Sequence, residues 1–180
     1  MKLLLFGKIG SGKSYVGELF QREFDLAYHD ADHDLPGAMK EAIRNHQTIT
    51  EEMRDDFVKS IINRIHQLSQ EHQHFCIAQA LFKNRHRLQI RAAFPELQMV
   101  WVRSDESLTD ARLEKRTGHV ASQYYAQMVN PNFEEPTHNH LLIENTGDDS
   151  SLLREMRAIF MPGDPGTVDE PSENRTLLPK

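Results

Sequence analysis

An eight-residue motif near the start of the chain constrains its fold more than any other feature. Residues 7–14 read Gly-Lys-Ile-Gly-Ser-Gly-Lys-Ser, which matches G-x-x-x-x-G-K-S, the phosphate-binding loop that joins a buried strand to a helix. An apolar run, residues 3–6, leads into the motif. Val16, Leu19 and Phe20 follow it at helical spacing. The motif therefore predicts a nucleotide-binding loop in preference to a structural glycine turn.

The loop carries the groups that bind nucleotide phosphates. Backbone N–H groups at a helix N-terminus attract anions, and glycines let the backbone approach them closely. In this motif the lysine, Lys13, reaches the β- and γ-phosphates and also acts in catalysis, while the hydroxyl of Ser14 ligates Mg²⁺. We therefore expect ATP and Mg²⁺ as cofactors. The expected nucleotide-binding residues of the loop are Gly7, Gly10, Ser11, Gly12, Lys13, Ser14 and Tyr15.

Composition bounds the possible partners. The chain has 180 residues, of which 38% are hydrophobic and 27% charged, and its net charge is −6. A chain with a net negative charge is not expected to bind nucleic acid or an anionic membrane non-specifically, since both require a concentrated basic surface on the protein. The single cysteine, Cys76, excludes an internal disulfide and lies in an apolar run that favours burial. The first apolar run is too short for a signal peptide. We expect a cytoplasmic protein, monomeric or homodimeric, that binds a nucleotide and a small-molecule acceptor.

Short apolar runs alternate with helix-like stretches along the chain, which is typical of β-α-β units that build a parallel sheet. Periodic apolar residues predict an amphipathic helix over residues 51–70, with a solvated polar side. A shorter helix is expected around residues 37–45, in an insert that covers the substrate and is not core. The fold class is thus a three-layer α/β P-loop domain with helices on both faces of a sheet of about five strands. The expected strands are residues 2–6, 26–29, 74–78, 97–102 and 140–144.

We expect one domain over residues 1–161. Residues 162–180 hold four of the eight prolines and little apolar periodicity, so they offer too little apolar surface to offset chain entropy. This composition predicts a disordered tail.

Two acidic residues follow the second expected strand. In an open parallel sheet, ligands bind beyond the carboxyl ends of the strands. Asp30 and Asp32 would lie on one face, near the phosphate loop, if the segment stays extended. Asp30 would then order Mg²⁺, and Asp32 would accept the proton of an attacking hydroxyl. The alternative is an acidic turn that caps the next helix, to which Asp34 could also contribute.

Polar and basic residues follow the third expected strand. Gln79 and Ala80 come first, and Lys83, Arg85 and Arg87 follow. Small and polar groups beside cations suit a polyhydroxy or carboxylate substrate, since arginine can hold a carboxylate with two hydrogen bonds. A solvated basic helix start is the alternative.

A basic helical face follows the fourth expected strand. Arg112, Lys115 and Arg116 are spaced i, i+3 and i+4, and Thr117-Gly118-His119 then breaks the helix. This pattern suits a mobile lid that closes out water and brings positive charge to the transferring phosphate. A plain surface face is the alternative.

Together these residues resemble the gluconate kinase family, close relatives of the shikimate kinases among small-molecule P-loop kinases. Members of that family carry an Asp-x-Asp after the second strand, similar to residues 30–32, whose second aspartate contacts the substrate and acts as base. Their lid opens with Arg-Leu-x-x-Arg-x-Gly-His, which residues 112–119 match. Their Ser-Ala-Leu-Lys-x-x-Tyr-Arg stretch is echoed by residues 79–87, and a Gln and Glu-Pro element by residues 123–136.

The resemblance implies roles for individual residues. The catalytic set would be Lys13, Asp32 and Arg116, and the lid arginines Arg112 and Arg116 would also bind nucleotide. The loop after the last strand, with Thr146 and Gly147, would lie near adenine. The implied substrate-binding residues are Asp32, Gln79, Ala80, Lys83 and Arg87, and the implied metal-binding residues are Ser14 and Asp30.

The chain also departs from the family. The family's His-Pro with a following Asn after the second carboxylate is absent, and Gln79 replaces the usual serine. The glycine triplet and lid Arg-Pro of shikimate kinases are also missing. The resemblance therefore implies an ATP-dependent phosphotransferase acting on a hydroxyl of a small, carboxylate-bearing acceptor, with gluconate as the leading example.

Three alternatives stay open. One is shikimate kinase-like activity on another acceptor. The second is a nucleotide-binding module without turnover. The third is a GTPase switch, because residues 34–37 match Asp-x-x-Gly, although they follow the loop too closely and no Asn-Lys-x-Asp guanine signature occurs.

Overall fold

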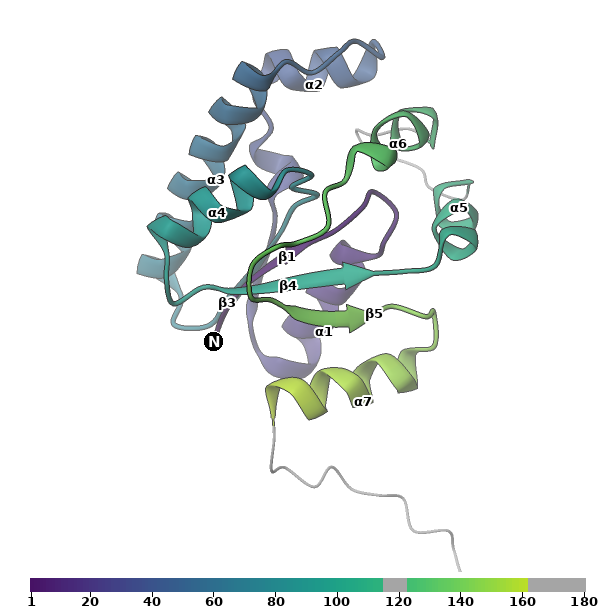
Figure 1. The fold of residues 1–180 in the computed structure, drawn as a ribbon. Coiled ribbons are helices and arrows are strands. Elements are labelled where there is room, and N and C mark those ends of the chain that lie inside the picture. The colour runs from purple at the N-terminus through teal and green to yellow at the C-terminus, as the bar shows by residue number, and fades with distance from the viewer. Residues whose placement is uncertain (115–122, 162–180) are drawn as a thin grey trace, which may run out of the picture.

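The computed structural model describes residues 1–114 and 123–161. They form a five-stranded sheet in the order β2-β3-β1-β4-β5, in which every pair of neighbouring strands is parallel (Figure 1). The strands are β1 (Lys2–Phe6), β2 (Ala27–Asp30), β3 (Phe75–Ala78), β4 (Gln98–Arg103) and β5 (Leu141–Glu144). The described helices are α1 (Lys13–Phe24), α2 (Gly37–Arg44), α3 (Glu51–Glu71), α4 (Asn84–Ala93), α5 (Glu106–Glu114), α6 (Gln123–Val129) and α7 (Asp149–Phe160). Two short 3-10 helices are η1 (Ala31–Asp34) and η2 (Asn130–Asn132).

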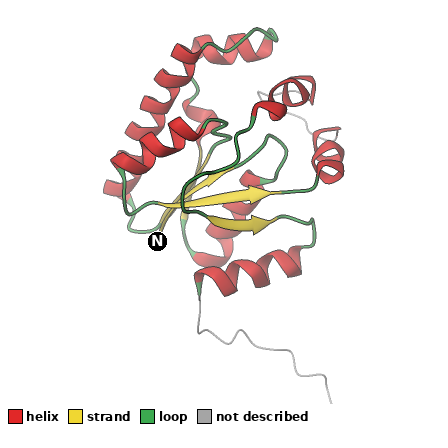
Figure 2. Ribbon diagram, in the orientation of Figure 1, coloured by secondary structure: helices red, strands yellow, loops and turns green. Residues whose placement is uncertain are grey.

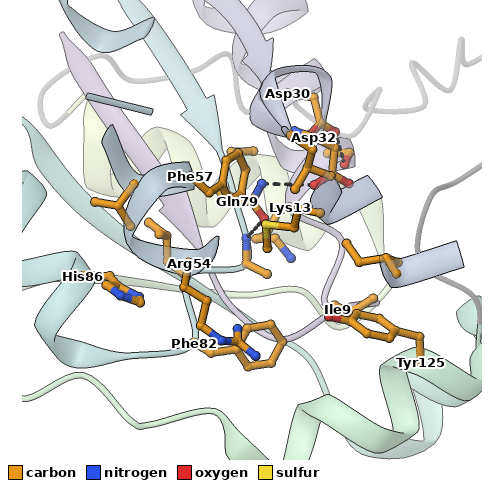
Figure 3. A pocket seen from close by; sticks show the side chains of 18 residues that line it. Ile9, Lys13, Asp30, Asp32, Arg54, Phe57, Gln79, Phe82, His86 and Tyr125 are labelled. Atoms are coloured by element: carbon orange, nitrogen blue, oxygen red, sulfur yellow. Dashed lines mark hydrogen bonds between the residues drawn. The ribbon is translucent and has the colours of Figure 1, made fainter. Parts of the chain in front are cut away.

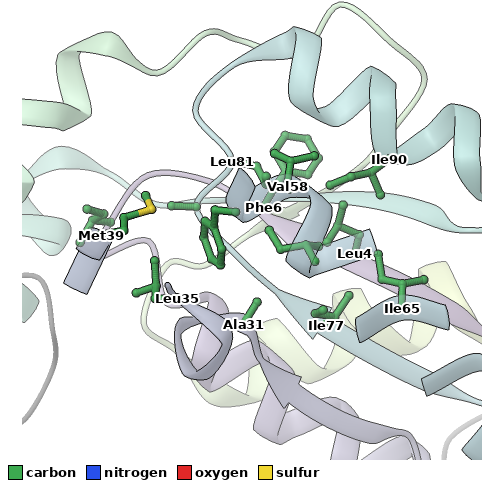
Figure 4. Close-up of a cluster of buried hydrophobic side chains, with 14 of the residues drawn as sticks. Leu4, Phe6, Ala31, Leu35, Met39, Val58, Ile65, Ile77, Leu81 and Ile90 are labelled. Atoms are coloured by element: carbon green, nitrogen blue, oxygen red, sulfur yellow. The ribbon is translucent and has the colours of Figure 1, made fainter. Parts of the chain in front are cut away.

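The sheet is covered on both faces, as the predicted three-layer fold requires. Helices α1 and α7 lie on one side, and α3 and α4 on the other (Figures 1 and 2). Successive side chains of the central strand β1 alternate between these layers. Leu3 and Leu5 pack in the α1 and α7 layer. Leu4 and Phe6 pack in the other layer, with Ile65 of α3 (Figure 4). Because both faces are covered, the central strands β1 and β3 are buried apolar runs without alternation, apart from Lys2 at the start of β1.

The predicted elements are present with small shifts in their ends. All five strands were expected within one residue at each end, and the helix predicted at residues 51–70 is α3. Thr50 caps α3, because its Oγ1 accepts a hydrogen bond of 3.2 Å from the backbone N–H of Met53. The thiol of Cys76 is buried as predicted, and burial raises its pKa to about 12.

The prediction that the α2 segment lies outside the core was wrong. Met39, Ala42 and Ile43 of α2 are buried and belong to the hydrophobic cluster above the sheet. Their i, i+3 and i+4 spacing forms one apolar helix face, and burying it stabilises the fold. The segment therefore covers a site and contributes to the core at once.

The predicted lid residues 115–122 and the predicted tail, residues 162–180, lie outside the described residues. Within residues 1–114 and 123–161, every helix is too short or too polar to span a bilayer.

Candidate active site

The phosphate loop has the backbone that its glycines predict. Gly12 has φ of 88°, a left-handed conformation, and a Cβ there would lie 2.1 Å from Nδ2 of Asn145. A side chain at this position would therefore be strained and would also clash. Helix α1 begins at the next residue, Lys13. Its first backbone N–H groups have no partner within the helix, which gives the loop an anion-binding end.

Lys13 and Ser14 lie where the loop meets the sheet. Nζ of Lys13 donates a hydrogen bond of 2.8 Å to the carbonyl oxygen of Lys8, so its side chain folds back along the loop. Oγ of Ser14 donates a hydrogen bond of 3.0 Å to Oδ2 of Asp30 at the end of β2. The hydroxyl of Tyr28 lies 3.3 Å from the same oxygen, and burial raises its pKa, which keeps it protonated as a donor. The two residues predicted to hold Mg²⁺ are thus neighbours.

Asp30 and Asp32 are joined by a tight turn. The sequence-based expectation of an extended segment was wrong, because residues 31–34 form η1. Oδ1 of Asp30 accepts a hydrogen bond of 3.0 Å from the backbone N–H of Asp32, and this local bond competes with an extended backbone. Both carboxylates nevertheless line the same cavity. Asp34, the candidate cap for the next helix, accepts from Arg64 instead, at 2.7 Å.

Gln79 fixes the orientation of Asp32. Its Nε2 donates a hydrogen bond of 3.0 Å to Oδ1 of Asp32, and its Oε1 accepts one of 2.6 Å from the backbone N–H of Ala80. The Gln79 side chain is buried and engaged at both ends. The shorter side chain of serine could not make both of these hydrogen bonds. Gln79 therefore positions Asp32 in a way that the usual serine could not.

These residues open onto a cavity of about 100 Å³ that is continuous with solvent. Asp30, Asp32, Gln79 and Lys13 lie together at one end of it (Figure 3). Arg54 of α3 lies on the other side of the cavity (Figure 3). The cavity thus has an acidic end beside the phosphate loop and a basic side chain opposite.

Arg54 is a site residue that the sequence analysis missed, because the polar side of α3 was assigned to solvent. Its Nε is buried without a hydrogen bond, although it lies 3.5 Å from Oε1 of Glu51. Glu51 is also held by Arg85 at 2.6 Å. The spacing of Arg54 from Phe57 and Val58, i to i+3 and i+4, could have revealed that it shares their face. An arginine in this setting is suited to an anionic ligand.

His86 is a second side chain of the cavity outside the predicted set. Its Nε2 lies 3.0 Å from Oδ1 of Asp55. Burial lowers the pKa of His86, while the carboxylate of Asp55 opposes that shift.

The predicted basic cluster at the acceptor site does not form. Arg87 is fully buried away from the cavity lining and donates hydrogen bonds of 2.5 Å to the carbonyl oxygens of Leu81 and Glu134. It also donates one of 2.7 Å to Oδ1 of Asn84. Carbonyl oxygens buried here need donors, and the guanidinium supplies them. Arg87 is therefore a structural residue.

Lys83 and Arg85 are also directed elsewhere. Nζ of Lys83 donates to Oε1 of Glu134 at 3.1 Å, and this carboxylate also accepts from the backbone N–H of Asn84 at the start of α4. Arg85 pairs with Glu51 and with Asp55. Neither cation lines the cavity, because acidic residues from distant parts of the chain hold both of them.

On the other side of the loop, Arg112 is linked to the phosphate loop through Asn145. Its Nη2 donates a hydrogen bond of 2.8 Å to Oδ1 of Asn145, whose Nδ2 donates one of 3.1 Å to the carbonyl oxygen of Ser11. Burial lowers the pKa of Arg112. A Cβ on Gly147 would lie 3.8 Å from Nη2 of Arg112. Three residues predicted to bind nucleotide, Ser11, Arg112 and Gly147, are thus neighbours.

The other predicted nucleotide residues are placed as follows. Tyr15 lies in the first turn of α1, where a hydrogen bond with Asp149 of α7 raises its pKa. The backbone N–H of Thr146 donates to the carbonyl oxygen of Glu144 at 3.1 Å. Arg116 lies outside the described residues.

The parallel sheet and its glycine-rich loop define a three-layer P-loop fold. No family model matches the chain. It is 23% identical over 131 residues to the thermoresistant gluconokinase of Escherichia coli strain K12, covering 73% of each chain. A solved sugar kinase from Janibacter sp. HTCC2649 is similar with a TM-score of 0.75 and 18% identity, over 87% of this chain and 92% of that one. A gluconokinase from Sinorhizobium meliloti 1021 has a TM-score of 0.72 and 21% identity, over 87% and 89%.

These comparisons confirm the predicted fold and the resemblance to gluconate kinases. At such low identity the solved structures share the fold with this chain, and its chemistry has to be argued from its own residues.

Proposed function

We propose that this protein is an ATP-dependent small-molecule kinase that transfers the γ-phosphate to a hydroxyl of a small acceptor bound in the cavity. The observation that carries this proposal is the run of hydrogen bonds from Ser14 to Asp30 and from Asp30 to the N–H of Asp32. It joins the phosphate loop to a carboxylate that lines an open, mostly apolar cavity with a few polar groups, which is the usual lining of a small-molecule site. The likeness to gluconokinases and a sugar kinase supports the same class of reaction.

The loop residues would hold the nucleotide. The backbone of residues 7–14 and Nζ of Lys13 would contact the phosphates, and Arg112 with Thr146 and Gly147 would lie beside the adenine. Oγ of Ser14 and the carboxylate of Asp30 are oxygen donors of the type Mg²⁺ prefers, and they are already 3.0 Å apart. The ion would supply neutralisation of phosphate charge at this point.

Asp32 would accept the proton of the acceptor hydroxyl. Gln79 holds one of its oxygens, which orients the carboxylate without supplying a positive charge. Arg116 would balance the charge that develops on the transferring phosphate. Positioning and electrostatics would account for most of the acceleration, as in other phosphoryl transfers.

Arg54 would pair with a carboxylate of the acceptor. It takes the role that the sequence analysis gave to Lys83 and Arg87, because it lies in the cavity and they do not. The likeness to gluconokinases makes gluconate the first acceptor to test.

The test compares Asp32→Asn with Asp30→Asn while phosphate transfer to a panel of acceptors is measured. Asp32→Asn should keep ATP affinity within a few-fold and lose turnover by about 100-fold, since an amide keeps the shape but cannot accept a proton. Asp30→Asn should instead raise the Mg²⁺ concentration needed for activity. Asp56→Asn, on the exposed side of α3, is the matched control.

Near-normal turnover of Asp32→Asn would show that the proposed base is wrong. Absence of transfer to every small molecule would favour the alternative, a nucleotide-binding module without turnover. Preference for GTP over ATP would favour a GTPase switch.

A further inference from the structure

Two asparagine side chains from distant parts of the chain hold the backbone of the phosphate loop. We propose that Asn130 and Asn145 are positioning residues, which keep the loop in its anion-binding shape before a nucleotide arrives. Each acts through the loop backbone and not on the reacting atoms. The inference rests on the proposed function, since it takes the loop of residues 7–14 to bind nucleotide phosphates.

Asn130 holds both backbone groups of Ile9. It lies in η2, just after α6 (Figure 1), and is 121 residues away from Ile9 in sequence. Its Oδ1 accepts a hydrogen bond of 2.9 Å from the backbone N–H of Ile9, and its Nδ2 donates one of 2.9 Å to the carbonyl oxygen of the same residue. One side chain therefore fixes the Ile9 backbone at two points.

Asn145 holds the loop two residues further on. It directly follows β5, and it is 1% exposed. Its Nδ2 donates a hydrogen bond of 3.1 Å to the carbonyl oxygen of Ser11, and its Oδ1 accepts one of 2.8 Å from Nη2 of Arg112. A guanidinium can only donate, so Arg112 keeps the oxygen of the amide on its own side and turns the Nδ2 donor toward the loop.

These contacts set the direction of two peptide groups. In a trans peptide the C=O and the following N–H point to opposite sides. Because the carbonyl oxygens of Ile9 and Ser11 are turned toward the asparagines, the N–H groups of Gly10 and Gly12 point away from them. An anion-binding loop needs such an arrangement, since N–H groups attract phosphate oxygens and carbonyl oxygens repel them.

The glycines of the loop make this restraint useful. Gly10 and Gly12 have φ of 89° and 88°, and glycine populates positive and negative φ about equally readily. The peptide groups before them could therefore turn over at little cost in a free loop, which would direct a carbonyl oxygen at the phosphates. A hydrogen bond to each carbonyl oxygen opposes that rotation, so less ordering is left to be done when the nucleotide binds.

The experiment measures the affinity for inorganic tripolyphosphate by calorimetry, because this probe carries the phosphates of ATP without the nucleoside. Asn130→Asp and Asn145→Asp keep the side-chain shape but place an acceptor where the loop carbonyl needs a donor. Each should weaken tripolyphosphate binding at least about fivefold. Asn132→Asp is the matched control, since Asn132 is exposed, lies two residues from Asn130 and receives the same charge. It should weaken binding less than about twofold.

Serine variants separate the hydrogen bonds from the charge. Asn130→Ser and Asn145→Ser are neutral and too short to make these contacts, so each should weaken binding at least about threefold. Asn132→Ser should bind like the parent. If Asn145→Asp does not fold, Asn145→Ser decides for that position. Affinities are compared where circular dichroism shows each variant folded, because a role in stability alone would lower the free energy of unfolding without changing them.

The outcomes distinguish this inference from the proposed function. If the parent transfers phosphate but the folded serine variants bind tripolyphosphate like the parent, or no worse than Asn132→Ser, the positioning role is wrong and the kinase proposal stands. If the variants weaken binding as expected but the parent transfers phosphate to no acceptor, the positioning role holds and only the kinase proposal fails. If the parent binds neither tripolyphosphate nor ATP, both are wrong.

Discussion

Arg85 and Arg87 lie two residues apart in the first turn of α4, and the structure gives them opposite surroundings. Arg87 is fully buried, whereas the side chain of Arg85 is 49% exposed. We predict that Arg87→Met strongly lowers the free energy of unfolding and that Arg85→Met changes it little. Methionine keeps most of the length and volume of arginine, so the comparison isolates the hydrogen bonds and the charge.

The expected size of the loss follows from the contacts of Arg87. Without the guanidinium, the carbonyl oxygens of Leu81 and Glu134 lose their buried donor, at about 1 to 3 kcal/mol for each group. The guanidinium also lies 4.9 Å and 5.1 Å from the ring centroids of Phe6 and Phe133, which adds a favourable cation–π contact.

Removing the buried charge offsets part of this loss. Burial lowers the pKa of Arg87 to about 10, so the group is still protonated at neutral pH and its desolvation opposes folding. We therefore expect a net loss of about 2 to 4 kcal/mol on Arg87→Met. The exposed ion pairs of Arg85 should contribute little.

Urea unfolding at neutral pH, followed by circular dichroism, measures both variants, and acceptor kinetics are recorded on the same samples. The slope with urea should stay constant if only stability changes. Suppose instead that Arg87→Met unfolds like the parent and raises the KM for the acceptor at unchanged kcat. Arg87 would then be an acceptor contact, as the sequence alone suggests, and the structural role argued here would be wrong.

Three further predictions follow from single contacts. Lys13→Ala should fold normally but lose ATP turnover by at least about tenfold, since a charge-assisted phosphate contact is worth about 1.5 to 3 kcal/mol; unchanged turnover would contradict the motif assignment. Burial opposes ionisation of Asp34, but hydrogen bonds from Arg64 and His29 outweigh it and lower its pKa. Asp34→Asn should therefore cost about 2 kcal/mol at neutral pH, and its deficit should shrink as the pH falls through that lowered pKa; a constant deficit in acid would contradict this. Burial, helped by the charge of Arg87, lowers the pKa of His138 to about 4. The neutral ring is thus favoured in the fold, so the parent should lose about 2 kcal/mol between about pH 7 and about pH 5, a loss that His138→Phe should abolish, and equal pH slopes would refute it.

The layers of the fold were predictable because a parallel sheet buried on both faces leaves a plain mark on the sequence. Strand β3, for example, consists of four fully buried residues, so its apolar run has no alternation. The ends of strands were less certain, since Asp30 and Arg103 are polar although they are the last residues of β2 and β4. Polar residues at the carboxyl end of a strand, where ligands bind, have the same sequence pattern as a loop.

The part of the site next to the phosphate loop was also predictable. Asp30 and Gln79 lie at or just beyond the carboxyl end of a strand, and Ser14 lies in the first turn of the helix after the phosphate loop. The parallel topology brings these positions together. The local shape of the Asp30–Asp32 segment was not predictable from alternation alone. The carboxylate of Asp30 accepts a hydrogen bond from the N–H two residues ahead, and this local bond favours a turn over a strand. The alternation of polar and apolar residues carries no information about such a bond.

The sequence analysis assigned the basic residues of the acceptor site to the start of α4, whereas the cavity is lined by Arg54 of α3. The charge of an arginine does not show which group it will contact in the fold. Arg87 precedes the buried Ile90 by three residues, and Arg54 precedes the buried Phe57 by the same interval, so their helical spacing is equivalent. What separates them is an acceptor 47 residues away in sequence, the carbonyl oxygen of Glu134, which engages Arg87. The Nε of each arginine is buried without a hydrogen bond, but of the two only Arg54 lines the open cavity. Arg87 donates three hydrogen bonds to groups of the protein and so holds the chain together. An arginine whose side chain lines an open cavity is instead positioned to hold a ligand.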